Sequence, residues 1–121
     1  MRTHESEEMY LETILLLSQK KGAIRSVDIV EELDYAKSSV SRAVGLLVQK
    51  GYITVNGAGD IMLTPVGREK ATGIYERHRV ITKALMAVGA DEELAESNAC
   101  RIEHVISPEL FDILKKFAEE R

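Results

Sequence analysis

The sequence predicts a mainly α-helical protein that begins with a winged helix-turn-helix and continues as a second, helical lobe. Three segments with helical spacing of apolar residues come first, and two short strand-like runs around a Gly/Asn turn follow them. Three further helical segments complete the chain. We expect the first lobe to cover residues 1–68 and the helical lobe residues 69–121, with a continuous helix crossing the boundary.

The first lobe is expected to contain three helices. Residues 5–21 carry a broad apolar stripe at helical spacing. Ser26 is predicted to cap a short second helix, and a third helix over about 38–50 should end at Gly51. The residues of the third helix that are expected to face the core are Val40, Val44, Leu47 and Val48.

A β-hairpin and three more helices should follow. The runs YITV (52–55) and IMLT (61–64) flank the turn sequence NGAGD, which is typical of a hairpin. Thr64-Pro65 begins a long helix that should extend to about residue 88, and later helices should begin at Asp91 and at Ser107-Pro108. The last helix has a wide apolar face that is a candidate dimer surface, with packing inside the chain as the alternative; this face comprises Leu110, Phe111, Ile113, Leu114 and Phe117.

Composition and cysteine content favour a globular protein of the cytoplasm. Of the 121 residues, 45% are hydrophobic and 30% are charged, which excludes a disordered chain. No apolar run is long enough for a membrane span, and the polar, acidic first residues exclude a secretory signal. The single cysteine cannot form an intramolecular disulfide, which fits a reducing compartment.

The charge distribution indicates a DNA-binding surface on the third helix. The net charge of −4 argues weakly against a nucleic-acid partner, but residues 36–56 contain Lys37, Arg42 and Lys50 and no acidic residue. A helix-turn-helix places its second helix in the major groove. An ordinary polar helix face is the alternative. The candidate DNA-binding residues are Arg25, Lys37, Ser38, Ser39, Ser41 and Arg42.

The stretch NACRIEHVIS groups three potential ligands. On a helix, Cys100, Glu103 and His104 would share one face, because their spacing is i, i+3 and i+4. A Cys-His nucleophile lacks a third member and a nearby Gly-rich loop, and a structural zinc site usually takes several cysteines. A regulatory site for a transition metal fits mixed sulfur, nitrogen and oxygen donors better. The remaining alternative is a buried Cys100 beside a surface Glu-His pair.

Other donors could complete such a site. Met9 and Glu12 share a face of the first helix, and His78 lies midway along the long helix. Three helices that are distant in sequence could therefore meet at one ion. Met9 could instead be a core residue, and His78 a solvated one.

Four motifs resemble the family of metal-dependent repressors that includes the diphtheria toxin repressor and the manganese transport regulator. They are EMYLETI (8–14), LTPVGR (63–68), ERHR (76–79) and ACRIEHVIS (99–107), and the likeness covers essentially the whole chain. The resemblance implies a dimeric repressor, not an enzyme, that binds a divalent metal and then binds double-stranded operator DNA controlling metal uptake or homeostasis. It implies neither a membrane nor a small-molecule substrate as a partner.

The resemblance also implies the metal ligands. Met9, Cys100, Glu103 and His104 match the activating site of the iron-responsive branch. Glu12 and His78 match ligand positions of the manganese-responsive branch. The expected cofactor is thus Fe²⁺ or Mn²⁺, and Co²⁺, Ni²⁺ or Zn²⁺ are expected to substitute in vitro.

The chain departs from the iron-responsive branch at a second, ancillary metal site. Thr82 stands where that branch has an acid, and Glu96 stands where it has a histidine. The SH3-like domain of that branch has no counterpart. A metal-independent winged-helix regulator remains the main alternative function, and a metalloenzyme built on the same cluster is a second one.

Overall fold

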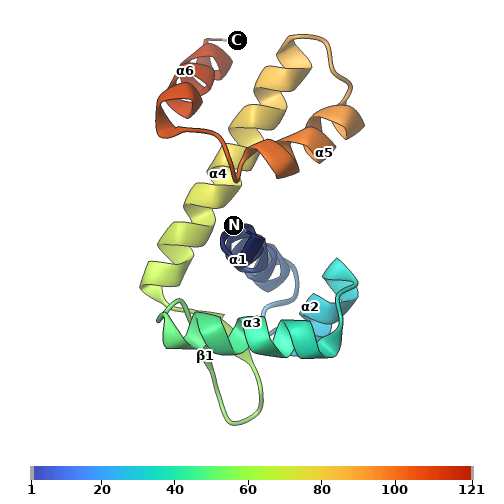
Figure 1. The fold of residues 1–121 in the computed structure, drawn as a ribbon, viewed down its shortest axis with the longest axis vertical. Coiled ribbons are helices and arrows are strands. Elements are labelled where there is room, and N and C mark those ends of the chain that lie inside the picture. The colour runs from blue at the N-terminus through green and yellow to red at the C-terminus, as the bar shows by residue number, and fades with distance from the viewer. Residues whose placement is uncertain (1, 121) are drawn as a thin grey trace. The chain divides into compact units, whose positions relative to one another are not determined.

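The computed structural model describes residues 2–120, and their side chains from residue 7 onward. The chain divides into two compact units, the first ending at Thr72 and the second beginning at Gly73 (Figure 1). Among the described residues, no helix is long and apolar enough to cross a membrane. The fold class predicted from the sequence, a winged N-terminal domain followed by helices, is confirmed.

The first unit is a winged helix-turn-helix. Its two strands pair antiparallel with Thr54 opposite Met62, and Ile24 adds an isolated bridge to Ile61. The loop between the strands projects away from the helices in Figure 1. The elements are α1 (Arg2–Lys21), α2 (Ser26–Leu33), α3 (Lys37–Gln49), β1 (Ile53–Val55), β2 (Ile61–Leu63) and the first turns of α4 (Pro65–Ala87).

A continuous apolar core holds these elements together. Helix α1 contributes more buried apolar residues than any other element of this unit, and the rest come mainly from α2, α3 and the two strands. Val48, which we expected in the core, is 42% exposed, because the buried stripe of α3 runs along Val40, Val44 and Leu47 and leaves Val48 on its edge. The other buried apolar residues of this unit are Tyr10, Leu11, Ile14, Leu15, Leu17, Ile24, Ile29, Ile53, Ile61 and Ala71.

The prediction that Ser26 caps α2 was wrong. Ser26 is the first helical residue, and Arg25 occupies the cap position with an extended backbone. The carboxylate of Asp28 accepts the Arg25 amide at 2.8 Å and is also paired with Lys21. The helix start is therefore stabilised by an acid in its first turn rather than by a serine hydroxyl.

Helix α4 begins in close contact with the hairpin. The Thr64 hydroxyl donates to the Gly51 carbonyl oxygen at 2.6 Å and accepts the Gly67 amide at 3.1 Å. A Cβ atom on Gly67 would lie 1.9 Å from the Tyr52 carbonyl oxygen. Only glycine allows this approach, so Gly67 fixes how α4 leaves the wing.

The second unit consists of three helices. It contains the rest of α4, then α5 (Glu92–Ile102) and α6 (Pro108–Glu119). Asp91 caps α5 by accepting the Leu94 amide at 2.8 Å, and Ser107 caps α6 with Pro108 in the first turn, as predicted. The buried apolar residues of this unit are Ile74, Ile81, Ala84, Ala95, Ala99 and Ala118.

Candidate functional site

Four of the predicted metal ligands lie together in the second unit. His78 comes from α4, and Cys100, Glu103 and His104 come from the end of α5 and the turn after it. The His78 Nδ1 atom is 2.8 Å from Glu103 Oε1 and 3.9 Å from the Cys100 Sγ atom. His104 Nε2 lies 3.4 Å from Glu103 Oε2. One carboxylate thus has an imidazole beside each of its oxygens.

The arrangement differs from the helix face that the spacing suggested. Helix α5 ends at Ile102, Glu103 forms its C-cap, and His104 belongs to the following turn. The alternative of a buried cysteine beside a surface Glu-His pair is wrong, because Cys100 is exposed and Glu103 is 0% exposed. The Glu103 amide still donates to the Ala99 carbonyl oxygen at 2.9 Å, which holds the carboxylate on the inner side of the helix end.

The environment of Glu103 suits a divalent cation. Its Oε2 atom is buried and has no hydrogen-bond partner within the part of the chain that the structure describes. Leaving a buried polar atom unsatisfied costs about 1–3 kcal/mol, and more if it is charged. A cation would satisfy this oxygen, and the imidazole, carboxylate and thiol groups nearby are the donors that first-row transition metals take.

The other two predicted ligands lie on α1, in the first unit. Met9 and Glu12 are one turn apart and both are half-buried. The Tyr35 hydroxyl donates to the Met9 sulfur at 3.1 Å, and the rings of Tyr35 and Tyr10 meet edge to face at 6.0 Å. Burial raises the pKa of Tyr10, and Tyr35 raises it further, so the Tyr10 phenol stays neutral near pH 7.

The residues at the ancillary positions make a poor second site. The Thr82 hydroxyl is buried and lacks a hydrogen-bond partner among the described residues, whereas Glu96 is exposed on α5. A neutral hydroxyl is a weak donor for a divalent ion compared with a carboxylate.

The predicted DNA-binding residues of α3 form an exposed surface. Arg25 is also exposed, at the start of α2, with its Nε atom 3.4 Å from the carboxylate of Asp60, which lies in the loop just before β2. Sequence reasoning missed Gly45, which is exposed on α3 and whose Cβ would meet nothing within 4 Å. The exposed α3 residues in question are Lys37, Ser38, Ser39, Ser41 and Arg42.

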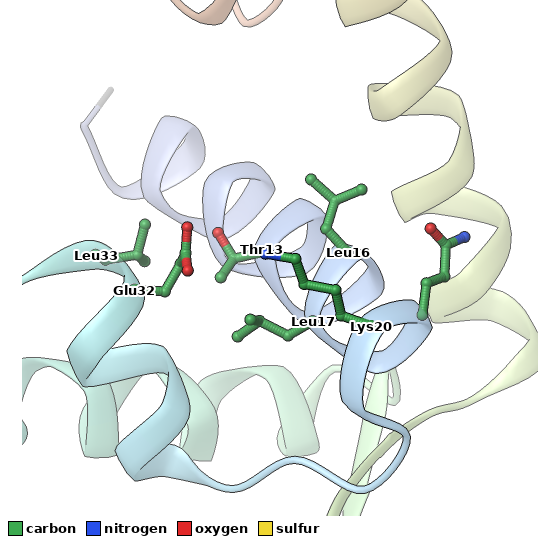
Figure 2. Close-up of a pocket in the computed structure, with 7 residues that line it drawn as sticks. Thr13, Leu16, Leu17, Lys20, Glu32 and Leu33 are labelled. Carbon is green, nitrogen blue, oxygen red and sulfur yellow. The ribbon is translucent and has the colours of Figure 1, made fainter.

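A cavity of about 390 Å³ in the first unit was also not predicted (Figure 2). Leucines of α1 and α2 form its apolar part, and Lys20 and Glu32 place charged groups beside it. None of the candidate metal-binding or DNA-binding residues lines it. Its lining residues are Thr13, Leu16, Leu17, Gln19, Lys20, Glu32 and Leu33.

Two family models match consecutive parts of the chain. The model described as "Iron dependent repressor, N-terminal DNA binding domain" matches residues 2–60. The model described as "Iron dependent repressor, metal binding and dimerisation domain" matches residues 64–120. Together they cover nearly the whole sequence.

Similar proteins include regulators from archaea and bacteria. An uncharacterized HTH-type transcriptional regulator of Methanocaldococcus jannaschii is 32% identical over 96% of this chain and 94% of its own length. The diphtheria toxin repressor of Corynebacterium diphtheriae is 32% identical over 88% of this chain, which spans only 47% of that protein. The regulator MntR of Lysinibacillus sphaericus is 34% identical over 84% of this chain and 73% of its own length.

Solved structures agree with these similarities. The manganese regulator SloR superimposes with a TM-score of 0.82 at 26% identity, over 95% of this chain and 54% of that one. IdeR of T. acidophilum superimposes with a TM-score of 0.80 at 26% identity, over 90% of this chain and 52% of that one. This chain therefore spans about half the length of those two proteins.

Proposed function

Since this chain belongs to the iron-dependent repressor family, we propose that it is a dimeric transcriptional repressor of the cytoplasm, activated by Fe²⁺ or Mn²⁺. Residues 1–68 bind operator DNA, and residues 69–121 provide most of the metal ligands and bind a second copy of the chain. The operators control genes of metal uptake or homeostasis. The family consists of transcriptional repressors, which are not enzymes.

The buried Glu103 carboxylate carries this proposal. An acid that is 0% exposed, with an imidazole beside each oxygen and one oxygen unsatisfied, has little value for folding alone. It is well suited to binding a cation, because bringing the ion in satisfies the oxygen and offsets the buried charge. A regulator that uses no metal would have no need for this arrangement.

We assign the ligand set to Met9, Glu12, His78, Cys100, Glu103 and His104. When bound, the divalent ion supplies positive charge that offsets the carboxylates. Glu103 and the two histidines hold the site in the helical unit, and Glu12 and Met9 connect it to the first helix of the DNA-binding unit. An ion that is bound by side chains of both units favours a narrower set of arrangements of these units. It increases DNA affinity only if the favoured arrangements are those that bind DNA.

The donor atoms favour the two candidate metals in different ways. The thiol of Cys100 and the thioether of Met9 are soft donors and favour iron, whereas the carboxylates of Glu12 and Glu103 suit manganese. The exposed Cys100 thiol is the donor that most distinguishes the two ions. A competition titration of Fe²⁺ against Mn²⁺ under anaerobic conditions would rank them.

The first test is anaerobic binding to DNA from upstream of the protein's own gene, at fixed salt, with chelator and then with Fe²⁺ or Mn²⁺. Salt must stay fixed because phosphate contacts make the affinity strongly salt-dependent. We expect either ion to increase DNA affinity about 5- to 150-fold, the usual size of an allosteric coupling. Equal binding with chelator would favour the metal-independent regulator.

Single substitutions test whether the metal-stimulated DNA binding depends on the candidate metal site. His104→Ala and Glu103→Gln should remove the metal stimulation while leaving the helical content unchanged by circular dichroism. Glu93→Gln, an exposed acid in the first turn of α5, is the matched control and should keep the stimulation. Full stimulation in His104→Ala would remove the cluster from the mechanism.

A further inference from the structure

We propose that Arg42 reads a guanine in the major groove, and that Gly45 is retained so that α3 can lie close to the base edges beside it. This inference rests on the proposed function and deepens it, because it assigns base selectivity to one side chain of the exposed surface of α3. Arg42 was predicted from the sequence to contact either phosphate or guanine, and Gly45 was not predicted at all.

On the exposed side of α3, the cationic side chain of Arg42 lies between two small residues. Ser38 lies one turn before Arg42 and Gly45 one turn after it, and all three are exposed. The buried stripe of Val40, Val44 and Leu47 lies on the other side of the helix. Apart from Lys37 at the first position of α3, Arg42 is thus the only cationic residue of this helix. The small residues on either side of Arg42 let the helix backbone approach a partner closely.

Gly45 has no role that the fold itself explains. Its backbone is helical, and a Cβ atom there would meet nothing within 4 Å. Gly67, by contrast, is required by the Tyr52 carbonyl oxygen, and Gly51 has a φ of 81° at the end of α3. A glycine inside a helix destabilises it relative to alanine. Gly73 on α4 has the same open space, so it is the place of Gly45 beside Arg42 on the exposed side of α3 that assigns it to the DNA-facing surface.

The chemistry of Arg42 selects guanine among the bases. The guanidinium group presents paired donors that match the O6 and N7 acceptors of guanine. Serine hydroxyls can form a hydrogen bond with any of the bases and so do not select one. No acidic residue occurs between Ala36 and Asn56 to neutralise Arg42 locally. Lys37, at the first position of the helix, has a single charged amine and is suited to a phosphate.

The test is selection of binding sites from a pool of DNA duplexes with a randomised core. The full chain would be used anaerobically with Mn²⁺ and, in a separate arm, with Fe²⁺. The wild type should select a motif that contains guanine, and Arg42→Gln should change that one position to adenine or erase its preference while the other positions persist. On the wild-type motif, Arg42→Gln should lose about 5- to 150-fold in affinity.

Two control variants distinguish a contact to a base from a general effect of charge. Lys37→Ala should weaken binding to all sequences alike and reduce the slope of log affinity against log salt by about one. Arg79→Ala removes an exposed charge on α4 and should leave the selected motif unchanged. If Arg42→Gln selects the same motif as the wild type, Arg42 contacts phosphate only and the inference fails.

The role of Gly45 is tested by placing a larger side chain at this position. Gly45→Leu should fold, since its side chain would meet open space, and yet should lose most of its specific DNA affinity. Gly73→Ala, at an exposed helical glycine of α4 that also has nothing within 4 Å, is the control and should bind DNA like the wild type. Undiminished binding by Gly45→Leu would overturn the role given to Gly45. A wild-type chain that selects no motif with either metal would instead overturn the proposed function itself.

Discussion

Gly67 shows how much of this fold depends on single residues. The carbonyl oxygen of Tyr52 occupies the space where a Cβ of residue 67 would lie, and the Tyr52 carbonyl also accepts the Thr64 amide at 3.0 Å. The wing and the start of α4 are therefore joined through backbone atoms that cannot move independently. A side chain at this position would have to push the hairpin away from the helix.

We predict that Gly67→Ala destabilises the protein by about 1–3 kcal/mol or more, because the added methyl group overlaps backbone rather than a flexible side chain. Urea denaturation followed by circular dichroism would measure the loss. Gly73→Ala, where the methyl group meets open space, should instead gain up to about 1 kcal/mol. Equal stability of the two alanine variants would contradict the steric role of Gly67.

Residue types could be predicted from the sequence, but their surroundings could not. Cys100, Glu103 and His104 were recognised as donors from their spacing, yet the exposure of the thiol and the burial of the carboxylate were not foreseen. The reason is that burial depends on which other segments pack against each side chain, and the spacing along one helix does not report this. The need for glycine at 67 depends on Tyr52, a contact that no local pattern reports.

At the scale of the element, the helices and the hairpin agreed with the sequence pattern to within a few residues. Their ends were less predictable, because several side chains could supply each cap. For α2 the serine was the expected cap, but Asp28 makes the contact to the Arg25 amide instead. Lys21, which lies outside α2, also pairs with Asp28 and adds to this contact.

Asp28→Ala should destabilise the protein by about 1 kcal/mol near neutral pH, the usual value of a helix cap. The side-chain bond from Lys21, and then the Arg25 amide, hold the pKa of Asp28 below its ordinary value of 3.8. The contribution is therefore present above the unfolded pKa and is lost as the pH falls through the lower, folded pKa. Thermal denaturation over a range of about pH 2 to 7 would follow this loss of stability. Glu31→Ala, an exposed acid of the same helix, should show little effect.

Helix α6 carries the apolar surface that we expect to join two copies of the chain. Leu110 is 49% exposed and Ile113 is 63% exposed, on a helix whose Ala118 is buried. Ile113→Asp should shift the protein from dimer to monomer in sedimentation experiments, because a charge would have to be buried in the interface. Met62→Asp, at a similarly exposed residue of the wing, is the control and should remain dimeric. A dimeric Ile113→Asp would place the interface elsewhere.

At the scale of the whole molecule, α4 belongs to both units. It starts against the wing, crosses the boundary between Thr72 and Gly73, and carries His78 in the second unit. The sequence predicted a helix that spans the boundary. It could not determine whether donors on α1 act together with those of the second unit, because that depends on tertiary contacts between segments far apart in the chain.

Hydrogen exchange can test that joint action. On addition of Mn²⁺ we expect slower amide exchange in α5 and also in α1, because Glu12 is assigned to the same ion. In the Glu12→Gln variant, the metal-induced protection of α1 amides should disappear, while part of the protection of α5 amides remains. If the wild type gains protection in α5 alone, the ion is held only by the second unit.

The unsatisfied oxygen of Glu103 has a consequence for the amount of protein in the cell. The metal-free chain bears the cost of that buried oxygen, and an ion that binds only the folded state adds about 2.7 kcal/mol of stability at a hundred times its dissociation constant. A difference of about 1–2 kcal/mol is enough to change the steady-state abundance of a protein several-fold through degradation of its unfolded form. Under the proposed function, metal scarcity would thus shorten the lifetime of the repressor as well as release it from DNA, and relief of repression would have two causes that act together.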